Sequence, residues 1–463
     1  MDAAISLAKN VVTIRYEDIP SDVIEIHKKQ TLDILATAIG GSAAAGCKDL
    51  AELIREWGGK EESTVIGYGD RVPAPHAAQL NATMGDALDY DDTSDTGGVH
   101  SATTVIPACF AAAERHGSVS GKEFLAAVAV AVDLVQRMGL ATKINPDVGI
   151  PPWNGWEITP LYGFFGATAA AGKIFNLGHE RMINAFGIAY SQASGNAQCV
   201  DEGKLTKRIQ PGFAARGGVV AAILAEKGIT AANNSFEGRN GLFPVYHQGV
   251  YDREALTSEL GKRFEGAIVA FKPWPCCRGN HTAIDAALSL RREHSLGPGD
   301  ISQVTVTSGR VTREAVSRPL EVKRRPRNVV DAQFSIPWTV AAALVYGKVQ
   351  IKHFTLEALN DPNILKIAEK VAFVFDDSLS INVVEPAIVE IKVIDGRILT
   401  KRVDFPYGNP NNPMSWESIT EKLRDCALYA IRPIPEDTLG KVVQLVRGME
   451  GLKDVGSVMR LLC

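Results

Sequence analysis

The chain has 463 residues, of which 46% are hydrophobic, with a formal net charge of -4 and a pI near 6.2. This length allows two domains with sizeable cores. The mild acidity argues against a nucleic-acid partner, because nucleic-acid binding usually needs a basic face.

Seven cysteines are scattered along the chain without a CxxC motif or a paired framework. We therefore expect free thiols and a cytoplasmic protein, in which most cysteines act as small core residues. Asp2 stands early and no basic stretch precedes an apolar run, so no secretory signal is expected. The most apolar stretches, residues 103–113 and 124–135, are bounded by charges within less than the span of a bilayer, which predicts buried helices and no membrane partner.

Helical patterns dominate the first 265 residues. A capped, apolar-periodic helix at residues 21–39 runs into Gly40-Gly41, which is a stop signal, and the next helix, Cys47–Trp57, ends at a second glycine pair. A short strand-like piece at 63–67 follows. Further helices are expected at residues 75–88, 102–115, 121–142, 159–175, 180–194 and 211–227. Their abundant Ala and Gly let helices approach closely, which predicts a compact all-helical body.

Near residue 261 the sequence pattern changes from helical periodicity to a mixture of strand and helix patterns. Strands are expected at residues 267–271, 304–308, 371–376, 387–393 and 398–405, with helices at 282–292 and 331–347. A turn-dense segment at 408–413 is followed by helices at 416–428 and 435–446. The fold class predicted is mainly α: a large helical domain, residues 1–265 and 410–463, with a smaller inserted α+β domain, residues 266–409.

Residues 85–104, between two helical patterns, carry the highest concentration of ionisable side chains that could act in catalysis. This stretch contains five aspartates, Asp86, Asp89, Asp91, Asp92 and Asp95. Gly97-Gly98 and then His100 follow them. Crowded carboxylates must be solvated, bind a cation or face basic groups. One interpretation is a solvated loop whose aspartates cap helices. The other is a site in which carboxylates raise the pKa of His100 and suit it to general acid–base work.

Several separated motifs resemble one known family. They are Asp89-Tyr90-Asp91-Asp92-Thr93 with His100 downstream, Gly203-Lys204-Leu205-Thr206-Lys207-Arg208, Phe271-Lys272-Pro273-Trp274-Pro275, and Gly408-Asn409-Pro410-Asn411-Asn412-Pro413. In this order they are similar to the motifs of the MmgE/PrpD family, which includes 2-methylcitrate dehydratase, cis-aconitate decarboxylase and iminodisuccinate epimerase. The resemblance implies a helical domain plus an α+β domain, an active site between them, a homodimer, and no metal or organic cofactor.

The resemblance also assigns roles to individual residues. Asp89, Thr93, His100, Lys207 and Lys272 match the family's active-site positions. A proton next to a carboxylate is hard to remove, because the carbanion adds charge to an anion. The two lysines would neutralise a small carboxylate substrate and stabilise that charge, and His100, oriented by Asp89, would carry the proton. Thr93 would bind the substrate or fix the loop.

Some positions depart from the family pattern. Glu157, in an aromatic and Pro-bearing loop at 145–158 that we expect to line a site or an interface, stands where family members carry histidine. Cys277 replaces another histidine and is expected to be a packed thiol, with Arg278 and His281 nearby as further candidate substrate-binding residues. The decarboxylases' site tyrosine has no counterpart at residues 311–330, a segment that is rich in Arg and Lys. These departures argue against a cis-aconitate decarboxylase and favour an altered substrate.

The leading hypothesis is a cofactor-independent lyase or isomerase that abstracts a proton alpha to a carboxylate, foremost a 2-methylcitrate-dehydratase-like hydro-lyase. An epimerase or a decarboxylase of the same family is the alternative. From another class, an Asp-rich helical chain fits a metal-dependent cyclase, although aromatic residues are only 7% and no second Mg²⁺ motif is evident. The replaced positions also leave open a catalytically silent binding homologue.

Overall fold

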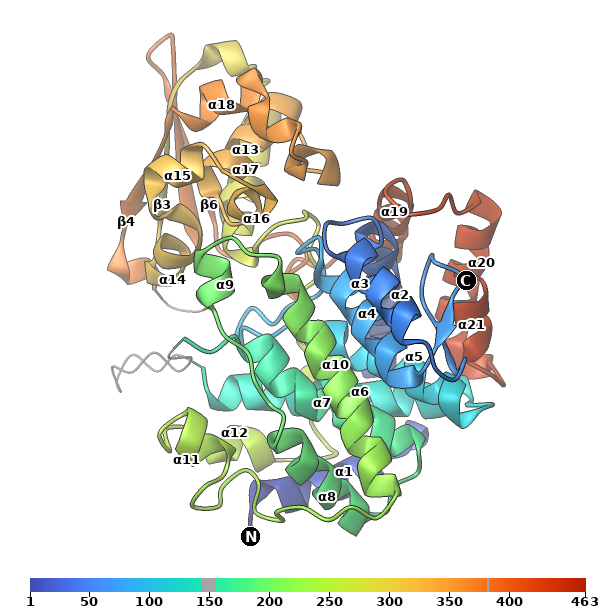
Figure 1. Ribbon diagram of the computed structural model, residues 1–463. Coiled ribbons are helices and arrows are strands. Elements are labelled where there is room, and N and C mark those ends of the chain that lie inside the picture. The colour runs from blue at the N-terminus through green and yellow to red at the C-terminus, as the bar shows by residue number, and fades with distance from the viewer. Residues whose placement is uncertain (144–154, 381–382) are drawn as a thin grey trace.

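The structure is a computed structural model that describes residues 1–143, 155–380 and 383–463. It is mainly α, with a large helical body and a smaller α+β unit at one end (Figure 1). The helices of the body are α1 (Ala3–Thr13), α2 (Ser21–Gly41), α3 (Cys47–Trp57), α4 (Ala74–Asp86), α5 (Ala102–His116), α6 (Gly121–Ala141), α7 (Ile158–Ile174), α8 (His179–Tyr190), α9 (Gln198–Asp201), α10 (Thr206–Glu226), α11 (Leu242–Tyr246), α12 (Arg253–Thr257), α19 (Trp416–Ala427), α20 (Glu436–Arg447) and α21 (Gly456–Arg460). A short hairpin of β1 (Ser63–Thr64) and β2 (Arg71–Val72) joins them.

Small residues let the central helices of the body pack closely. α7 lies against α5, α6 and α10. A Cβ on Gly218 of α10 would come within 2.4 Å of the Cβ of Ala167, and one on Gly163 within 2.6 Å of Thr104 Cγ2. Neither separation is sterically possible, so both glycines are needed for the helix spacing seen here. α6 is the one helix in the described part of the chain that is long and apolar enough to cross a membrane, and 94% of its most apolar window is buried in this core.

The α+β unit is built on a four-stranded sheet with the order β4-β3-β5-β6. β3 (Ile301–Ser308) runs parallel to β4 (Val371–Phe375) and antiparallel to β5 (Ala387–Val393), which pairs in turn with β6 (Ile398–Val403). Alternate residues of β5 are buried, so the sheet has one core face. α13 (His281–Glu293) and α17 (Ile336–Tyr346) pack against the sheet; the shorter helices are α14 (Arg310–Thr312), α15 (Leu320–Arg324), α16 (Val329–Gln333) and α18 (Pro362–Ala368).

The buried apolar residues form two clusters. The first draws on the N-terminal helices and on the C-terminal segment, where α19 packs on α2 beside it in Figure 1. The second begins at Trp274 and holds the sheet, α13 and α17. These clusters are compatible with the division at residues 266 and 409, which stays a proposal.

Two predicted elements differ in the structure. The strand expected at 267–271 is wrong: a 3-10 turn, Glu265–Ala267, is followed by a single bridge between Ala270 and Thr93, because this segment crosses between the units and pairs with loops instead of a sheet. The helix expected at 331–347 is split into α16 and α17, and the hydroxyl of Ser335 accepts a hydrogen bond from the N–H of Trp338 at 3.0 Å as the cap of α17.

Candidate active site

Local backbone geometry explains how the aspartate-rich loop is shaped. α4 ends at Asp86, and Asp89 then adopts a left-handed conformation with φ of 51°, which Asp tolerates better than most residues. Further along, Asp92 accepts hydrogen bonds from the N–H of Ala102, at 3.2 Å, and from Gln30, at 2.9 Å. Asp92 therefore stabilises the start of α5, as the helix-cap interpretation predicts. Burial raises its pKa to about 7.

Three other aspartates form a continuous chain of ion pairs with the predicted basic residues. Lys207 Nζ, in the first turn of α10, lies 3.0 Å from Asp86 Oδ2 and 2.9 Å from Asp89 Oδ1. Lys272 Nζ lies 3.4 Å from Asp89 Oδ1 and 3.6 Å from Asp91 Oδ1. His100 Nδ1 lies 3.2 Å from Asp91 Oδ2. The structure thus gathers Asp89, His100, Lys207 and Lys272 in one place, although the lysines face aspartates of this chain.

The carboxylate that faces His100 belongs to Asp91, which corrects the expectation that Asp89 orients the imidazole. The left-handed turn at Asp89 directs its carboxylate to the two lysines instead. Burial opposes the charged imidazole, but the Asp91 carboxylate outweighs it and raises the pKa of His100. The pKa of Asp91 is lowered to about 2, because His100 and Lys272 together outweigh burial.

Thr93 connects the aspartate loop to the segment that carries Lys272. Its backbone N–H donates to the carbonyl of Ala270 at 2.9 Å, and the N–H of Ala270 donates back at 2.8 Å. Lys272 Nζ also donates to the carbonyl of Asp89 at 3.1 Å. The contacts of Thr93 support a role in fixing the loop.

Lys422 of α19 completes this arrangement and was missed by the sequence analysis. Its buried ammonium lies 2.6 Å from Asp33 Oδ1 and donates to the carbonyls of Tyr90, at 2.5 Å, and Lys272, at 3.1 Å. Burial raises the pKa of Asp33 to about 6, even with Lys422 beside it. The C-terminal segment therefore connects the aspartate loop to the crossover that carries Lys272.

Glu157 and Cys277 lie within electrostatic reach of the ion pairs. Glu157 precedes α7, and its carboxylate makes no hydrogen bond or ion pair with the described residues; burial raises its pKa, while Lys207 and His100 oppose the shift. Burial, with a further contribution from Asp89, raises the pKa of the Cys277 thiol to about 11. A thiol with that pKa is largely protonated at neutral pH, so Cys277 fits the expected packed thiol and not a nucleophile.

Arg278 and His281, the other candidate substrate-binding residues, are engaged in contacts within the protein. Arg278 donates from Nε and Nη2 to the two carboxylate oxygens of Asp95, each at 2.9 Å, and from Nη1 to the carbonyl of Tyr407 at 3.0 Å. His281 Nδ1 lies 3.1 Å from Arg278 Nη1, and its Nε2 lies 3.1 Å from the carbonyl oxygen of Cys276. Burial lowers the pKa of His281 well below its ordinary value. Arg278 thus joins the α+β unit to the aspartate loop, and His281 contacts Arg278 from within its own unit.

Most of the aromatic loop expected to line the site, residues 145–154 of 145–158, lies outside the described residues. Trp156, just beyond it, packs against Tyr246 with ring centroids 4.6 Å apart. Across the described ranges, no group of three or more His, Cys, Asp or Glu side chains is arranged to hold a metal ion.

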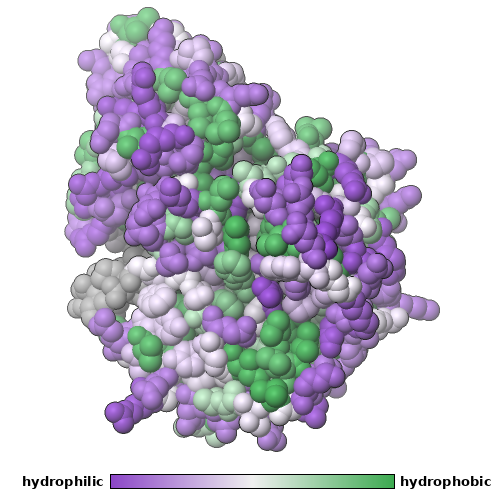
Figure 2. Space-filling model, in the orientation of Figure 1, coloured by the Kyte–Doolittle hydropathy of each residue, from purple (hydrophilic) through white to green (hydrophobic). Residues whose placement is uncertain are grey.

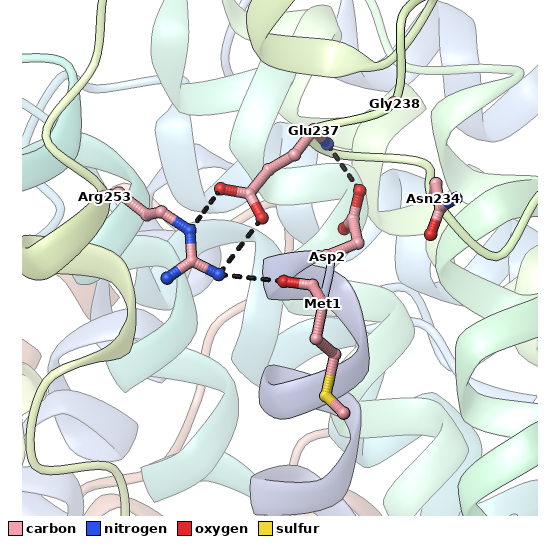
Figure 3. Close-up of a pocket in the computed structure, with 6 residues that line it drawn as sticks. All are labelled: Met1, Asp2, Asn234, Glu237, Gly238 and Arg253. Carbon is pink, nitrogen blue, oxygen red and sulfur yellow. Dashed lines mark hydrogen bonds and ion pairs between the residues drawn. The ribbon is translucent and has the colours of Figure 1, made fainter.

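A separate pocket of about 620 Å³ lies beside the N-terminus, and the ion-pair chain contributes no residue to it (Figure 3). Arg253 Nε donates to Glu237 Oε1 at 2.7 Å, and the N–H of Glu237 donates to Asp2 at 2.7 Å. The charged side chains that line it, Asp2, Glu237 and Arg253, are thus already bonded to one another or to the N-terminal segment.

Comparison with known proteins identifies the family of this chain. The model of the MmgE/PrpD N-terminal domain matches residues 5–254, and that of the MmgE/PrpD C-terminal domain matches residues 274–446. The chain is 28% identical to the cis-aconitate decarboxylase-like protein oryM of Aspergillus oryzae, covering 98% of this chain and 95% of that protein. It is 27% identical to a cis-aconitate decarboxylase of Aspergillus terreus, covering 98% of this chain and 94% of that protein. It is also 27% identical to the cis-aconitate decarboxylase of Homo sapiens, covering 99% of this chain and 94% of that protein. The chain belongs to the MmgE/PrpD family and is a lyase-type enzyme.

Proposed function

We propose that this MmgE/PrpD family member is a lyase that acts on a small carboxylic acid with His100 as the proton carrier and without a bound cofactor. The observation that carries the proposal is the pair of His100 and Asp91 beside Lys207 and Lys272. The side chains of His100 and Lys207 keep 20% and 13% of their surface exposed, whereas Asp91 is fully buried. A substrate can therefore reach the imidazole and one ammonium group, while the carboxylate that tunes the imidazole stays out of water.

In a dehydration, neutral His100 takes the proton alpha to the substrate carboxylate. The electron pair moves onto that carboxylate, where the ammonium of Lys207 stabilises the added charge. The bond from the neighbouring carbon to its hydroxyl then breaks, and the proton taken by His100 leaves with the hydroxide as water. The products are an unsaturated acid and water. The Glu157 carboxylate, at the position where the motif resemblance implies a histidine, favours an altered substrate.

Decarboxylation is the second candidate, because the relatives reported above are cis-aconitate decarboxylases or resemble them. In that reaction the bond from carbon to a carboxylate breaks, CO₂ leaves, and the electron pair stays on the substrate. The imidazolium form of His100 then donates its proton to that carbon. A histidine whose pKa is raised by Asp91 can serve either reaction near neutral pH.

A proton NMR screen of small carboxylic acids in deuterated water tests the proposal. Wild type is compared with His100→Gln and Lys207→Met, and Lys366→Met, on the exposed face of α18, is the matched control. Dehydration gives an unsaturated acid and exchange of the alpha proton, whereas decarboxylation gives bicarbonate and one deuteron in the product. Exchange that persists in both site variants would remove the catalytic assignment, and wild type inert toward every acid would favour a binding homologue.

The same screen separates a metal-dependent cyclase from the proposed enzyme. A chelator such as EDTA should leave the rate of the proposed reaction unchanged. Loss of activity on chelation, with recovery on addition of Mg²⁺, would favour the metal-dependent class.

We also propose that the protein is a homodimer whose interface includes α10. Figure 2 shows hydrophobic side chains gathered on the face of the helical body along which α10 runs in Figure 1. Leu205, Phe213, Leu224 and Ile229, at or near this helix, are exposed, and large apolar patches commonly mark protein interfaces. Light scattering after size exclusion should give twice the chain mass for wild type and the chain mass for a Phe213→Glu, Leu224→Glu double variant.

A cytoplasmic location is a further proposal, supported by seven cysteines that are all free. Cell fractionation with compartment markers tests it. We propose neither a nucleic-acid nor a membrane partner.

A further inference from the structure

The buried side of α2 carries polar groups that the proposed mechanism does not use. His27, Gln30 and Asp33 follow one another at intervals of three residues, so they lie on one face of the helix, and each of them is fully buried. Asp33 pairs with Lys422. His27 and Gln30 bond to each other, with 2.7 Å between His27 Nδ1 and Gln30 Oε1. Burial of polar groups is costly unless they are bonded, so three of them on one buried helix face call for an explanation.

The side chain of Gln30 connects α2 to the aspartate loop. Its Nε2 donates to Asp92 Oδ2 at 2.9 Å. The hydroxyl of Ser101 donates to the same oxygen at 3.2 Å, and the backbone N–H of Ala102 donates to Asp92 Oδ1 at 3.2 Å. From α6, Gln136 Nε2 donates to the hydroxyl oxygen of Ser101 at 3.0 Å. These contacts form one buried chain, Gln30–Asp92–Ser101–Gln136, which we name the Asp92 network.

The Asp92 network lies directly beside the central ion pair of the candidate active site. Asp91 precedes Asp92 in the chain, and His100 precedes Ser101. The contact of Asp91 with His100 and the hydrogen bond of Ser101 to Asp92 therefore join residues 91–92 to residues 100–101 at two neighbouring points. A shift of one segment along the other would break both contacts.

The ion pair by itself does not fix the direction of the imidazole. His100 Nδ1 lies 3.2 Å from Asp91 Oδ2. Within the described ranges, however, neither carboxylate oxygen of Asp91 nor His100 Nδ1 has a partner with hydrogen-bond geometry. The orientation of His100 must then come from the backbone on either side of its side chain. There the N–H of His100 donates to Thr159 Oγ1 at 3.1 Å, and the next two residues are held by Asp92.

We propose that Gln30 and Gln136 are positioning residues for His100, because they fix the Asp92 carboxylate and the Ser101 hydroxyl that hold the imidazole beside Asp91. This inference rests on the proposed function, since it names residues that act through the proton carrier of that site. Both glutamines are buried, so they act through the Asp92 network and not by contact with the substrate.

Replacing either glutamine by methionine separates position from charge. The change keeps an unbranched side chain of similar length and removes no charged group. The charged groups that act on His100 or on Asp92 all remain, namely Asp33, Asp91, Glu157, Lys207 and Lys272. A change in the behaviour of His100 therefore reports a change in its position.

The test measures kcat, KM and the pKa of His100 in wild type, Gln30→Met, Gln136→Met and the control Gln79→Met. Gln79 is a buried glutamine of α4 whose Oε1 has no hydrogen-bond partner among the described residues. The two network variants should lower kcat by roughly 10- to 100-fold with KM nearly unchanged, because displacement of a catalytic group by about 1 Å costs up to about 100-fold. The pKa of His100, followed by NMR of ¹³C-labelled histidine rings, should fall by at least about 0.5 units as the imidazole leaves Asp91. Gln79→Met should match wild type in all three quantities.

A double-mutant cycle tests whether Gln136 acts through Ser101. Ser101→Ala removes the hydroxyl that accepts the hydrogen bond from Gln136. This variant should lower kcat on its own, and adding Gln136→Met should then change kcat by less than about twofold, because the bond is already lost. Fully additive losses would overturn the proposed chain of contacts. Since Ser101→Ala removes only one hydroxyl, it also decides the question if a glutamine variant does not fold.

The same measurements separate this inference from the proposed function. If wild type is active, unchanged kcat and unchanged pKa of His100 in both glutamine variants would overturn the positioning role and leave the function in place, even with a lower melting temperature. If wild type turned over no acid, the proposed function would fail. The titration would still test the positioning role: a lower pKa of His100 in both variants would support it, and an unchanged pKa would overturn it.

Discussion

Replacing Asp91 by Asn tests the central electrostatic contact of the candidate active site. The change keeps the shape of the side chain and removes its charge, 3.2 Å from His100 Nδ1. With an effective dielectric constant of about 20, a charge pair at that separation is worth roughly 5 kcal/mol. Burial of the imidazole and the nearby charges of Lys272 and Lys207 oppose this attraction, and opposite charges at such distances commonly move a pKa by about 1 to 3 units. We therefore expect the pKa of His100 to fall by about 1 to 3 units in Asp91→Asn.

The measurement is an NMR titration of protein labelled with ¹³C in its histidine rings. The chain has nine histidines, and the His100 signal is identified by its absence in His100→Gln. Asp70→Asn is the control, because Asp70 is paired with Arg55 and belongs to no part of the site. The charge of His100 also acts on Glu157, so Glu157→Gln reports the separate contribution of that carboxylate. If the pKa of His100 in Asp91→Asn stayed within about 0.3 units of the wild-type value, the assigned cause of the shift would be wrong.

Three further predictions concern other parts of the same site. Lys422→Met leaves the buried Asp33 carboxylate without its ion pair, so the free energy of unfolding should fall by about 3 to 5 kcal/mol. Urea denaturation measures the change, with the exposed Lys441→Met as the control. An unchanged denaturation midpoint for Lys422→Met would contradict this prediction. Glu157→His should raise the turnover of a tricarboxylate, because it replaces a carboxylate that repels such a substrate, and unchanged turnover would mean that Glu157 lies outside the pocket. The pKa of His100 is raised in the folded protein, so protonation of His100 stabilises the fold below pH 6.5, and this stabilisation is lost as the pH rises through the folded pKa. The melting temperature of His100→Gln should therefore lie further below that of wild type at pH 6 than at pH 9.

Elements with strong local signals could be predicted closely from the sequence. Cys47–Trp57 and Ala387–Val393 match the expected bounds, because glycines follow the first, and apolar and charged residues alternate from Val389 to Val393 in the second. α1 was missed, although a signal was present: the Asp2 side chain accepts from the N–H of Ala4 as its cap. The segment at 267–271 has the composition of a strand, but its pairing with Thr93 depends on tertiary contacts that composition cannot reveal.

The motifs identified the ion-pair chain but not how its members pair. Nothing in the spacing of Asp89 and Asp91 tells which of them faces His100, because the choice depends on one left-handed residue in the loop. Lys422 was detectable, since it falls at helical spacing with the buried Ile419, Leu423 and Cys426 of α19. A lysine on the apolar face of a helix needs a buried partner. The sequence does not identify that partner, because Asp33 is separated from Lys422 by 389 positions along the chain.

The aspartate-rich loop reconciles the two interpretations that its sequence left open, because its members have different tasks. Asp92 stabilises the start of α5, as a cap would. Asp95 accepts from Arg278 and from Asn409 Nδ2, at 2.7 Å, so it joins both chain crossings between the units. Asp86, Asp89 and Asp91 pair with the basic residues of the candidate site. Because one loop of about ten residues carries the junction and the ion pairs together, a substitution that loosens the junction should also displace the charges around His100.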